Sequence, residues 1–221
     1  QCYGDPNYRL SRDGEAKRSA PLPYATPHEL VIDFDNMASG LRDGGDNSDI
    51  AERIDYCLKR IPAGQKKDWL AESDVAAALG FVWGEAAQWE KGIASLRTAI
   101  AAERGQCPVR VIEQLANYEV RQAGSRWLAT DVGQRTDTLR QEIEPAIARL
   151  AALCVSGPTS ERLSLLGGAY KRLALIESAE NERNDEQPSL RKPADGKRRE
   201  ALVNMAEHYG QAFALRGKPY A

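Results

Sequence analysis

The 221-residue sequence contains few of the side chains that most often carry chemistry. Its two histidines and four cysteines do not occur as the closely spaced pairs that hold a zinc ion. It also lacks the glycine-rich loop followed by Lys and Ser or Thr that cradles a nucleotide phosphate. We therefore expect neither a metal site of this kind nor a phosphate-binding loop, and we expect no cofactor.

Charge and hydrophobic patterning exclude further classes. The 30 Lys and Arg residues nearly balance the 32 Asp and Glu residues, so the composition indicates neither a nucleic-acid partner nor an anionic membrane. No apolar run approaches the roughly 20 residues of a membrane-spanning helix, and no signal segment opens the chain. Gln1 in place of an initiator Met indicates a processed chain or a part of a longer protein. The cysteines are too widely separated for a disulfide framework, so we expect a cytoplasmic, reducing environment.

The sequence is organised around residues 158–177, which have the pattern of an amphipathic helix. Pro158 and the Thr, Ser and Glu residues after it are typical of a helix N-terminus. Apolar side chains then recur three or four residues apart and form one helical stripe: Leu163, Leu166, Tyr170, Leu173 and Ile176. Gly167 and Gly168 interrupt the stripe. Because glycine costs about 1 kcal/mol relative to alanine in a helix, the pair predicts the close approach of a neighbouring helix.

The same arrangement occurs earlier in the chain. Leu79-Gly80-x-x-Trp83 repeats the Leu-Gly-x-x-aromatic spacing of that stretch, and both resemble the first-helix pattern of a tetratricopeptide repeat. We expect three degenerate helix pairs, at about residues 73–106, 109–158 and 160–217. The fold prediction is all-α: a degenerate tetratricopeptide-like helical-repeat solenoid over residues 28–221, preceded by an extended arm over residues 1–27. The large apolar residues on the stripes are expected in the core between stacked pairs.

Several positions depart from regular repeats. Glu119 occupies a key position that the repeat pattern reserves for a packing side chain. Pro145 lies within a helical pattern over residues 139–155, and it either marks the start of that helix or kinks it. Polar residues over 125–138 and 181–199 predict two inserted loops.

Candidate catalytic groups are few. Cys57 and His28 would act as nucleophile and base only if the fold brought them together, and both are explained more simply as ordinary helix residues. Glu29, Asp33 and Asp35 form an acidic cluster, but carboxylates in the first turns of a helix are ordinary partners of the helix dipole. We therefore expect a non-enzymatic chain. The rival interpretation is a small hydrolase that uses Cys57 or a carboxylate pair.

Two stretches resemble a known family. The sequences VIEQLAN, residues 111–117, and ERLSLLGGAYKRLA, residues 161–174, resemble the tetratricopeptide-like region of bacterial CHAT proteins, in which a caspase-like peptidase domain is joined to helical repeats. The second stretch also resembles the TRAFs-binding region of some stress-activated kinase kinases. Residues 1–6, QCYGDP, resemble the end of a CHAT domain. The resemblance implies that the catalytic His and Cys of such a protein precede Gln1, and that this chain is its regulatory or recognition arm.

The resemblance also implies a binding face. Such repeats usually bind a protein or peptide on the concave face that the first helices form. Carried over to this sequence, that face includes Phe81, Glu85, Arg110, Glu113, Asn117, Arg121, Ser164, Lys171 and Arg172. This mixture of polar and charged groups suits a protein or peptide surface with acidic or backbone groups. Lys171 and Arg172 are either ordinary solvent-facing charges or part of a ligand groove.

These observations predict a protein-interaction and regulatory module that controls an attached or associated CHAT peptidase. The alternative from another class is a stand-alone scaffold, in which open-ended repeats stack between chains and form an oligomer.

Overall fold

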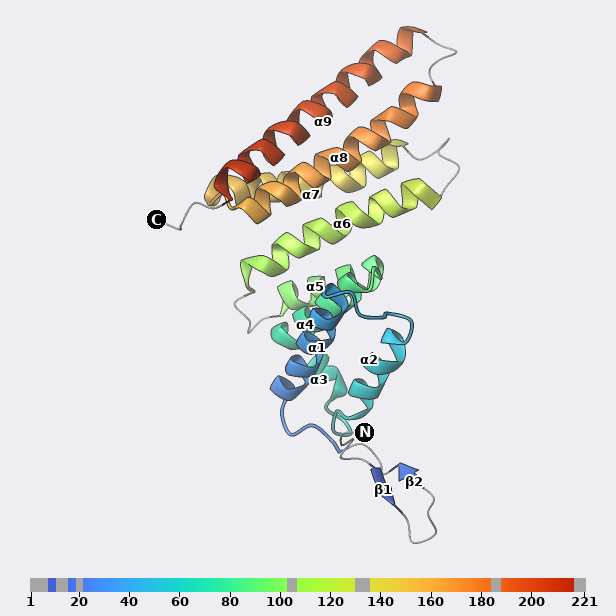
Figure 1. The fold of residues 1–221 in the computed structure, drawn as a ribbon, viewed down its shortest axis with the longest axis vertical. Helices are drawn as coiled ribbons and strands as arrows, with labels where there is room; N and C mark the ends of the chain where they lie inside the picture. The colour runs from blue at the N-terminus through green and yellow to red at the C-terminus, as the bar shows by residue number, and fades with distance from the viewer. Residues whose placement is uncertain are drawn as a thin grey trace.

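The computed structural model (Figure 1) describes residues 8–10, 16–18, 22–102, 107–129, 136–183 and 188–216. A short antiparallel hairpin comes first, formed by β1 (Tyr8–Leu10) and β2 (Ala16–Arg18). The helices in the described ranges are α1 (Pro27–Arg42), α2 (Ile50–Lys59), α3 (Lys66–Ala71), α4 (Ser73–Glu85), α5 (Trp89–Ala101), α6 (Val109–Ala129), α7 (Thr136–Ser156), α8 (Ser160–Arg183) and α9 (Pro188–Leu215).

The helices form an array in which each packs on its neighbours in sequence. From α4 to α9 every helix contacts the next, so that α4–α5, α6–α7 and α8–α9 are antiparallel pairs stacked along the long axis in Figure 1. The first helices of successive pairs also touch, α4 with α6 and α6 with α8, while α1 covers α4 at the N-terminal end. The predicted all-α architecture of tetratricopeptide-like pairs is confirmed.

Three groups of buried apolar side chains hold the array together. The first joins α1–α4 and includes Phe34 and Val82, and the second lies between α4, α5 and α6 around Leu96. The third lies between α6, α7 and α8, where Leu150 and Leu166 are fully buried. The apolar stripes identified in the sequence therefore face neighbouring helices, as stacked repeats require.

Two glycines allow aromatic rings to lie directly on a helix backbone. A Cβ at Gly84 would stand 1.9 Å from Cζ of Tyr118, so α4 and α6 approach closely only because residue 84 has no side chain. A Cβ at Gly167 would stand 3.1 Å from Cδ1 of Tyr209 on α9. The close approach predicted from the glycine pair in α8 is therefore present at Gly167.

The structure corrects the two predicted loops. Helix α6 continues to Ala129 and α7 begins at Thr136, so most of the segment 125–138 is helical apart from residues outside the description. Likewise, α8 runs to Arg183 and α9 begins at Pro188, which makes most of 181–199 helical. The physical reason is that both segments are rich in polar residues that suit a solvated helix surface and carry no apolar stripe to reveal it.

Of the two alternatives for Pro145, the start of a helix is excluded, because the residue lies inside α7. The extended arm over residues 1–27 contains the paired strands β1 and β2. The alternation that would reveal a strand is hard to recognise over three residues.

Ion pairs connect neighbouring helices both within a pair and between pairs. Glu177, 2% exposed, accepts hydrogen bonds from Arg140 at 2.6 and 3.0 Å and so ties α8 to α7. The Glu119 carboxylate on α6 accepts hydrogen bonds from Arg97 Nη2 of α5 at 2.9 Å and from Arg149 Nη1 of α7 at 2.6 Å. Glu119, the departure from the repeat pattern, thus bonds α6 to the helices on either side of it. Among the helices that the structure describes, none is long and apolar enough to cross a membrane.

Candidate functional site

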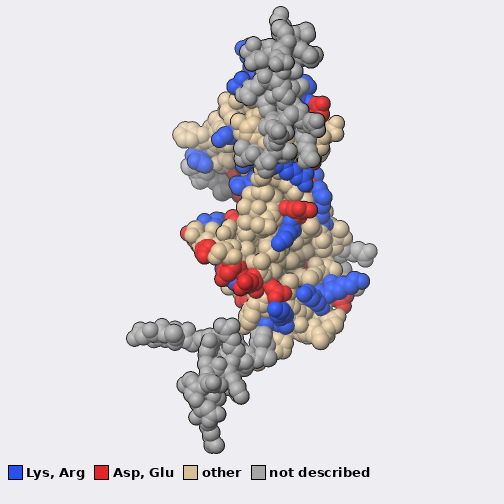
Figure 2. All heavy atoms as spheres, turned by 90° about the vertical axis from the view of Figure 1, so that its right-hand side faces the viewer, with Lys and Arg blue, Asp and Glu red and all other residues tan. Residues whose placement is uncertain are grey.

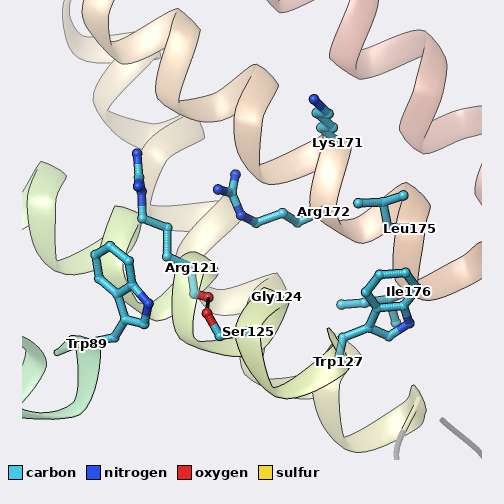
Figure 3. Close-up of a pocket in the computed structure, with 9 residues that line it drawn as sticks. All are labelled: Trp89, Arg121, Gly124, Ser125, Trp127, Lys171, Arg172, Leu175 and Ile176. Carbon is cyan, nitrogen blue, oxygen red and sulfur yellow. Dashed lines mark hydrogen bonds between the residues drawn. The ribbon is translucent and has the colours of Figure 1, made fainter. Parts of the chain in front are cut away.

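A hollow of about 260 Å³ lies where the start of α5 and the second half of α6 meet α8. Its lining residues are Trp89, Arg121, Gly124, Ser125, Trp127, Lys171, Arg172, Leu175 and Ile176 (Figure 3). We call this hollow the basic pocket, because it is lined by three cations and by no carboxylate.

The two arginines of the basic pocket come from different helices and meet in the same space. Figure 3 shows the Arg172 side chain extending from α8 towards α6, so that its guanidinium lies near that of Arg121. Arg172 Nη1 donates to the carbonyl oxygen of Gly168 at 3.1 Å, one turn earlier on α8. Arg121 Nε donates to Asn117 Oδ1 at 3.2 Å. Both guanidinium groups are therefore held by neutral oxygens and keep most of their donors available.

The absence of a carboxylate partner sets these arginines apart. Between Arg42 and Arg172, every arginine with a described side chain forms an ion pair except three, Arg110, Arg121 and Arg172. Arg110 and Arg121 are exposed, but Arg172 is half-buried, and a half-buried cation is normally paired because removing its hydration is costly. Burial lowers the pKa of Arg172, and the charge of Arg121 lowers it further. Two neighbouring cations without a carboxylate partner indicate a binding site for an anion.

Gly124 makes the geometry of Arg172 possible. A Cβ at residue 124 would stand 3.1 Å from Cδ and 3.3 Å from Nε of Arg172, closer than ordinary van der Waals contact. Without that Cβ, the arginine stem lies across the surface of α6, and its charged end reaches Arg121.

Aromatic and apolar side chains form the remaining walls. The Arg121 guanidinium lies 5.3 Å from the centre of the Trp89 ring, within the range of a cation–π contact. Trp89 in turn packs on Tyr118, with ring centres 5.6 Å apart. At the other end, Figure 3 places Trp127 beside Ile176 and below Leu175. The basic pocket therefore has a cationic end and an apolar end.

The nine residues predicted for the concave face fall into three groups. Arg121, Lys171 and Arg172 line the basic pocket. Phe81, Glu85 and Arg110 line a separate hollow of about 370 Å³ on α4 and α6, where Arg110 lies 4.9 Å from the Phe81 ring centre.

The third group has partners within the chain. Glu113, 8% exposed, accepts from Arg162 Nε at 2.5 Å, and Ser164 Oγ donates to the Ser160 carbonyl at 2.7 Å. Asn117 donates to Gln114 Oε1 at 2.9 Å while it accepts from Arg121. Their binding role stays a prediction.

The walls of the basic pocket were not evident in the sequence. A large aromatic residue such as Trp89 is expected in the core of stacked repeats, and it is half-buried at the rim of the pocket. Trp127 lies within the predicted loop over residues 125–138, and Gly124 lies directly before it. The sequence therefore did not indicate that both residues belong to a helix. A useful signal was present, because Gly124 and Ser125 lie three and four residues after Arg121 and so fall on the same face of one helix.

The proposed catalytic groups are not assembled. Cys57 is 2% exposed, and burial raises the pKa of its thiol, which makes it a poor nucleophile. His28 is exposed and lines a different hollow from Cys57. Asp33 bonds to Tyr24 and Arg60, and Glu29 accepts the backbone N–H of Ala25. The part of the chain with described side chains holds no group of three or more His, Cys, Asp or Glu residues suited to a metal ion.

Comparison with known proteins identifies the family. The family described as Tetratricopeptide Repeats-Sensor, TPR-S, matches residues 88–221, which is more than half of the chain. The chain belongs to the TPR-S family. No curated protein and no solved structure matches it.

The TPR-S region contains the whole basic pocket, since its lining residues run from Trp89 to Ile176. Tetratricopeptide repeats are typically non-catalytic, and their stacked helices form extended surfaces that bind protein partners. The family description adds that members act as sensors.

Proposed function

We propose that this TPR-S chain is a non-enzymatic sensor module that captures an acidic segment of a protein or peptide on the face formed by α4, α6 and α8. The observation that carries the proposal is that, among the described side chains of α1–α8, the arginines without an ion pair are Arg110, Arg121 and Arg172, and all three belong to α6 and α8. Arg121 and Arg172 line one hollow, and Arg110 precedes Arg121 by about three helical turns, so that both project from the same side of α6. Lys171 adds a fourth cation beside Arg172.

The surrounding charge supports an anionic partner. On the side of the molecule shown in Figure 2, acidic side chains gather mainly in the lower half, where Figure 1 places α1–α5, while Lys and Arg predominate above them. Guanidinium groups bind carboxylates and phosphates through paired hydrogen bonds, and charge complementarity accelerates encounter. A partner with an acidic segment would therefore be guided towards α6 and α8.

The proposal is tested by reversing charge on this face. The double variant Arg121→Glu/Lys171→Glu should abolish capture of the acidic partner in a pull-down, while circular dichroism stays that of a helical protein. The matched control is Arg198→Glu/Arg199→Glu, which makes the same charge change at exposed positions on α9. Unchanged capture by the first variant would remove the proposal.

We further propose that the partner is a caspase-like peptidase of the CHAT class, attached or associated. The support is the resemblance of residues 111–117 and 161–174 to the repeat region of CHAT proteins. Co-expression with a CHAT peptidase encoded by the same gene or beside it should yield a complex that survives gel filtration. Independent elution of the two proteins would contradict this part of the proposal.

A second candidate function is assembly with other copies of the chain. Helix α9 exposes Val203 by 57% and Phe213 by 76%, and it is the outermost described helix of the array. An apolar helix face at the end of a stack favours contact with another helical protein. Light scattering tests this, because self-assembly raises the mass with concentration and Phe213→Glu should prevent the rise.

A further inference from the structure

The basic pocket is small compared with the face proposed to receive a protein. Its volume of about 260 Å³ is at the lower limit for small-molecule sites, which are commonly on the order of 300 Å³ or more. One side chain or one small molecule fills such a space. The pocket therefore recognises a single chemical group.

The charge of the pocket indicates which group this is. Two guanidinium groups and one ammonium line it, no carboxylate does, and the described carboxylates of the chain form no ion pair with any of the three. A single carboxylate would neutralise one of these charges and leave the mutual repulsion of the other two. A doubly charged anion with three acceptor oxygens, as in a phosphate monoester, neutralises two of the three charges and offers an acceptor oxygen to each cation.

The walls indicate what the anion is attached to. Trp127, Leu175 and Ile176 form an apolar end beside the cations, and Trp89 offers a ring face at the other end. Flat rings stack on tryptophan, and apolar walls exclude water from a charged contact and strengthen it. A bare inorganic ion would leave these walls without a partner.

We propose that the basic pocket binds a phosphate monoester that carries a flat ring, joined to the phosphate directly or through a sugar, with the phosphate between Arg121 and Arg172 and the ring against Trp127. This rests on the proposed function, in that it names the acidic group that the face of α4, α6 and α8 captures. Lys171 lies at the rim and contributes charge.

Calorimetric titration of the full chain tests the ligand class without any mutation. Phenyl phosphate should bind at least about tenfold more tightly than inorganic phosphate, which lacks the ring, and than phenyl sulfate, which has the same shape and one charge fewer. Phenol should not bind. Equal affinity for phenyl phosphate and phenyl sulfate would contradict the requirement for a doubly charged anion. Equal affinity for phenyl phosphate and inorganic phosphate would contradict the requirement for a ring.

Protonation of the ligand gives an independent test. A phosphate monoester loses its second proton with a pKa of about 6, so the doubly charged form falls to roughly a tenth at pH 5. The affinity for phenyl phosphate should therefore drop about tenfold between pH 7.5 and pH 5, whereas that for phenyl sulfate should stay constant. A flat profile for phenyl phosphate would contradict the proposal.

Matched variants locate the site. Arg172→Gln should weaken phenyl phosphate binding by about tenfold or more, because a hydrogen bond to a charged group is lost. Lys171→Gln, at an exposed position that tolerates substitution, should weaken it severalfold. Arg199→Gln makes the same change of net charge on the exposed surface of α9 and should leave binding unaltered. Equal losses in all three variants would show nonspecific attraction and would reject the pocket.

Two sources share this chemistry, and two further titrations separate them. A peptide with a phosphorylated tyrosine and a nucleoside 5′-monophosphate are each compared with their forms lacking phosphate. Tighter binding of either supports the proposal and identifies the source, while equal binding with and without phosphate contradicts it.

Failure of the two proposals is distinguishable. Suppose that a protein partner binds through Arg121 and Lys171, and that phenyl phosphate neither displaces this partner nor increases its affinity. This result would reject only the assignment of the pocket to a phosphate monoester. Suppose instead that the chain binds phenyl phosphate, but that the Arg121→Glu/Lys171→Glu variant still captures the protein partner. This result would reject only the proposed protein-binding face.

Discussion

The Arg172 side chain lies across Gly124, with 3.1 Å between Cδ and the position that a Cβ at residue 124 would occupy. We expect Gly124→Ala to displace the Arg172 stem and to weaken ligand or partner binding severalfold. The helix should not suffer, because alanine is favoured over glycine in a helix interior by about 1 kcal/mol. Binding titrations and urea unfolding measured together would show loss of affinity with preserved stability.

Gly210→Ala is the matched control for this variant. Residue 210 also lies inside a helix, α9, and a Cβ there meets nothing within 4 Å. The control should gain a little stability and bind as the parent does. If Gly124→Ala also binds as the parent does, the position of Arg172 is not important for recognition.

Gly84→Ala should destabilise the fold. The added Cβ would overlap the Tyr118 ring, so α4 and α6 must separate or the ring must move. Overpacking of this kind costs about 1–3 kcal/mol. Urea unfolding checks it, with Gly40→Ala in α1 as control, because nothing lies within 4 Å of a Cβ at residue 40. A similar stability for both variants would show that the array adjusts freely between α4 and α6.

The buried pair of Arg140 and Glu177 predicts a strong asymmetry between single and double variants. Glu177→Gln removes the buried carboxylate partner of Arg140, whose other carboxylate partner, Asp137, is exposed, and should lower the free energy of unfolding by about 3 kcal/mol. Arg140→Met/Glu177→Leu removes both charges and should be distinctly more stable than Glu177→Gln. A double-mutant cycle by chemical denaturation measures both, and a double variant as unstable as the single one would contradict a desolvated pair.

Alkaline pH should destabilise the fold. Burial raises the pKa of the Tyr24 hydroxyl, helped by its hydrogen bond to Asp33, and burial likewise raises the pKa of Tyr118. Below the unfolded pKa of about 10 both states hold these protons, and above it only the unfolded chain loses them. Stability should therefore fall as pH rises above about 10, by about 1.4 kcal/mol per pH unit for each tyrosine. Urea unfolding from pH 8 to 11 should show a smaller slope for Tyr118→Phe.

The paired helices could be predicted from the sequence because their apolar stripes face other helices. Leu163, Leu166 and Ile176 recur at helical spacing, and all three are buried. The same logic fails where a helical segment carries no apolar stripe. The ends of α6 and α8 and the start of α9 carry polar residues without a stripe, and the pattern for a solvated helix resembles that for a loop.

The basic pocket could be predicted only in part. Arg121, Lys171 and Arg172 followed from the resemblance to binding repeats, and they do line one hollow. The walls did not follow, because Trp89 and Trp127 are distant from Arg172 in sequence and meet it only through the stacking of α5, α6 and α8. The pairing of most other arginines with carboxylates on neighbouring helices is equally a product of that stacking.

Glu119 has a consequence for how such an array can evolve. A consensus repeat is interchangeable with its neighbours, so arrays of this type lengthen or shorten by copying units. Here one carboxylate, 13% exposed, receives arginines from the helices on both sides of α6. A copied α6–α7 unit would carry Arg149 of α7 with it, but it would bring Glu119 to a place without Arg97 of α5. The α6–α7 unit is therefore suited to its own position in the array. We expect related chains to differ in repeat number at the ends of the array.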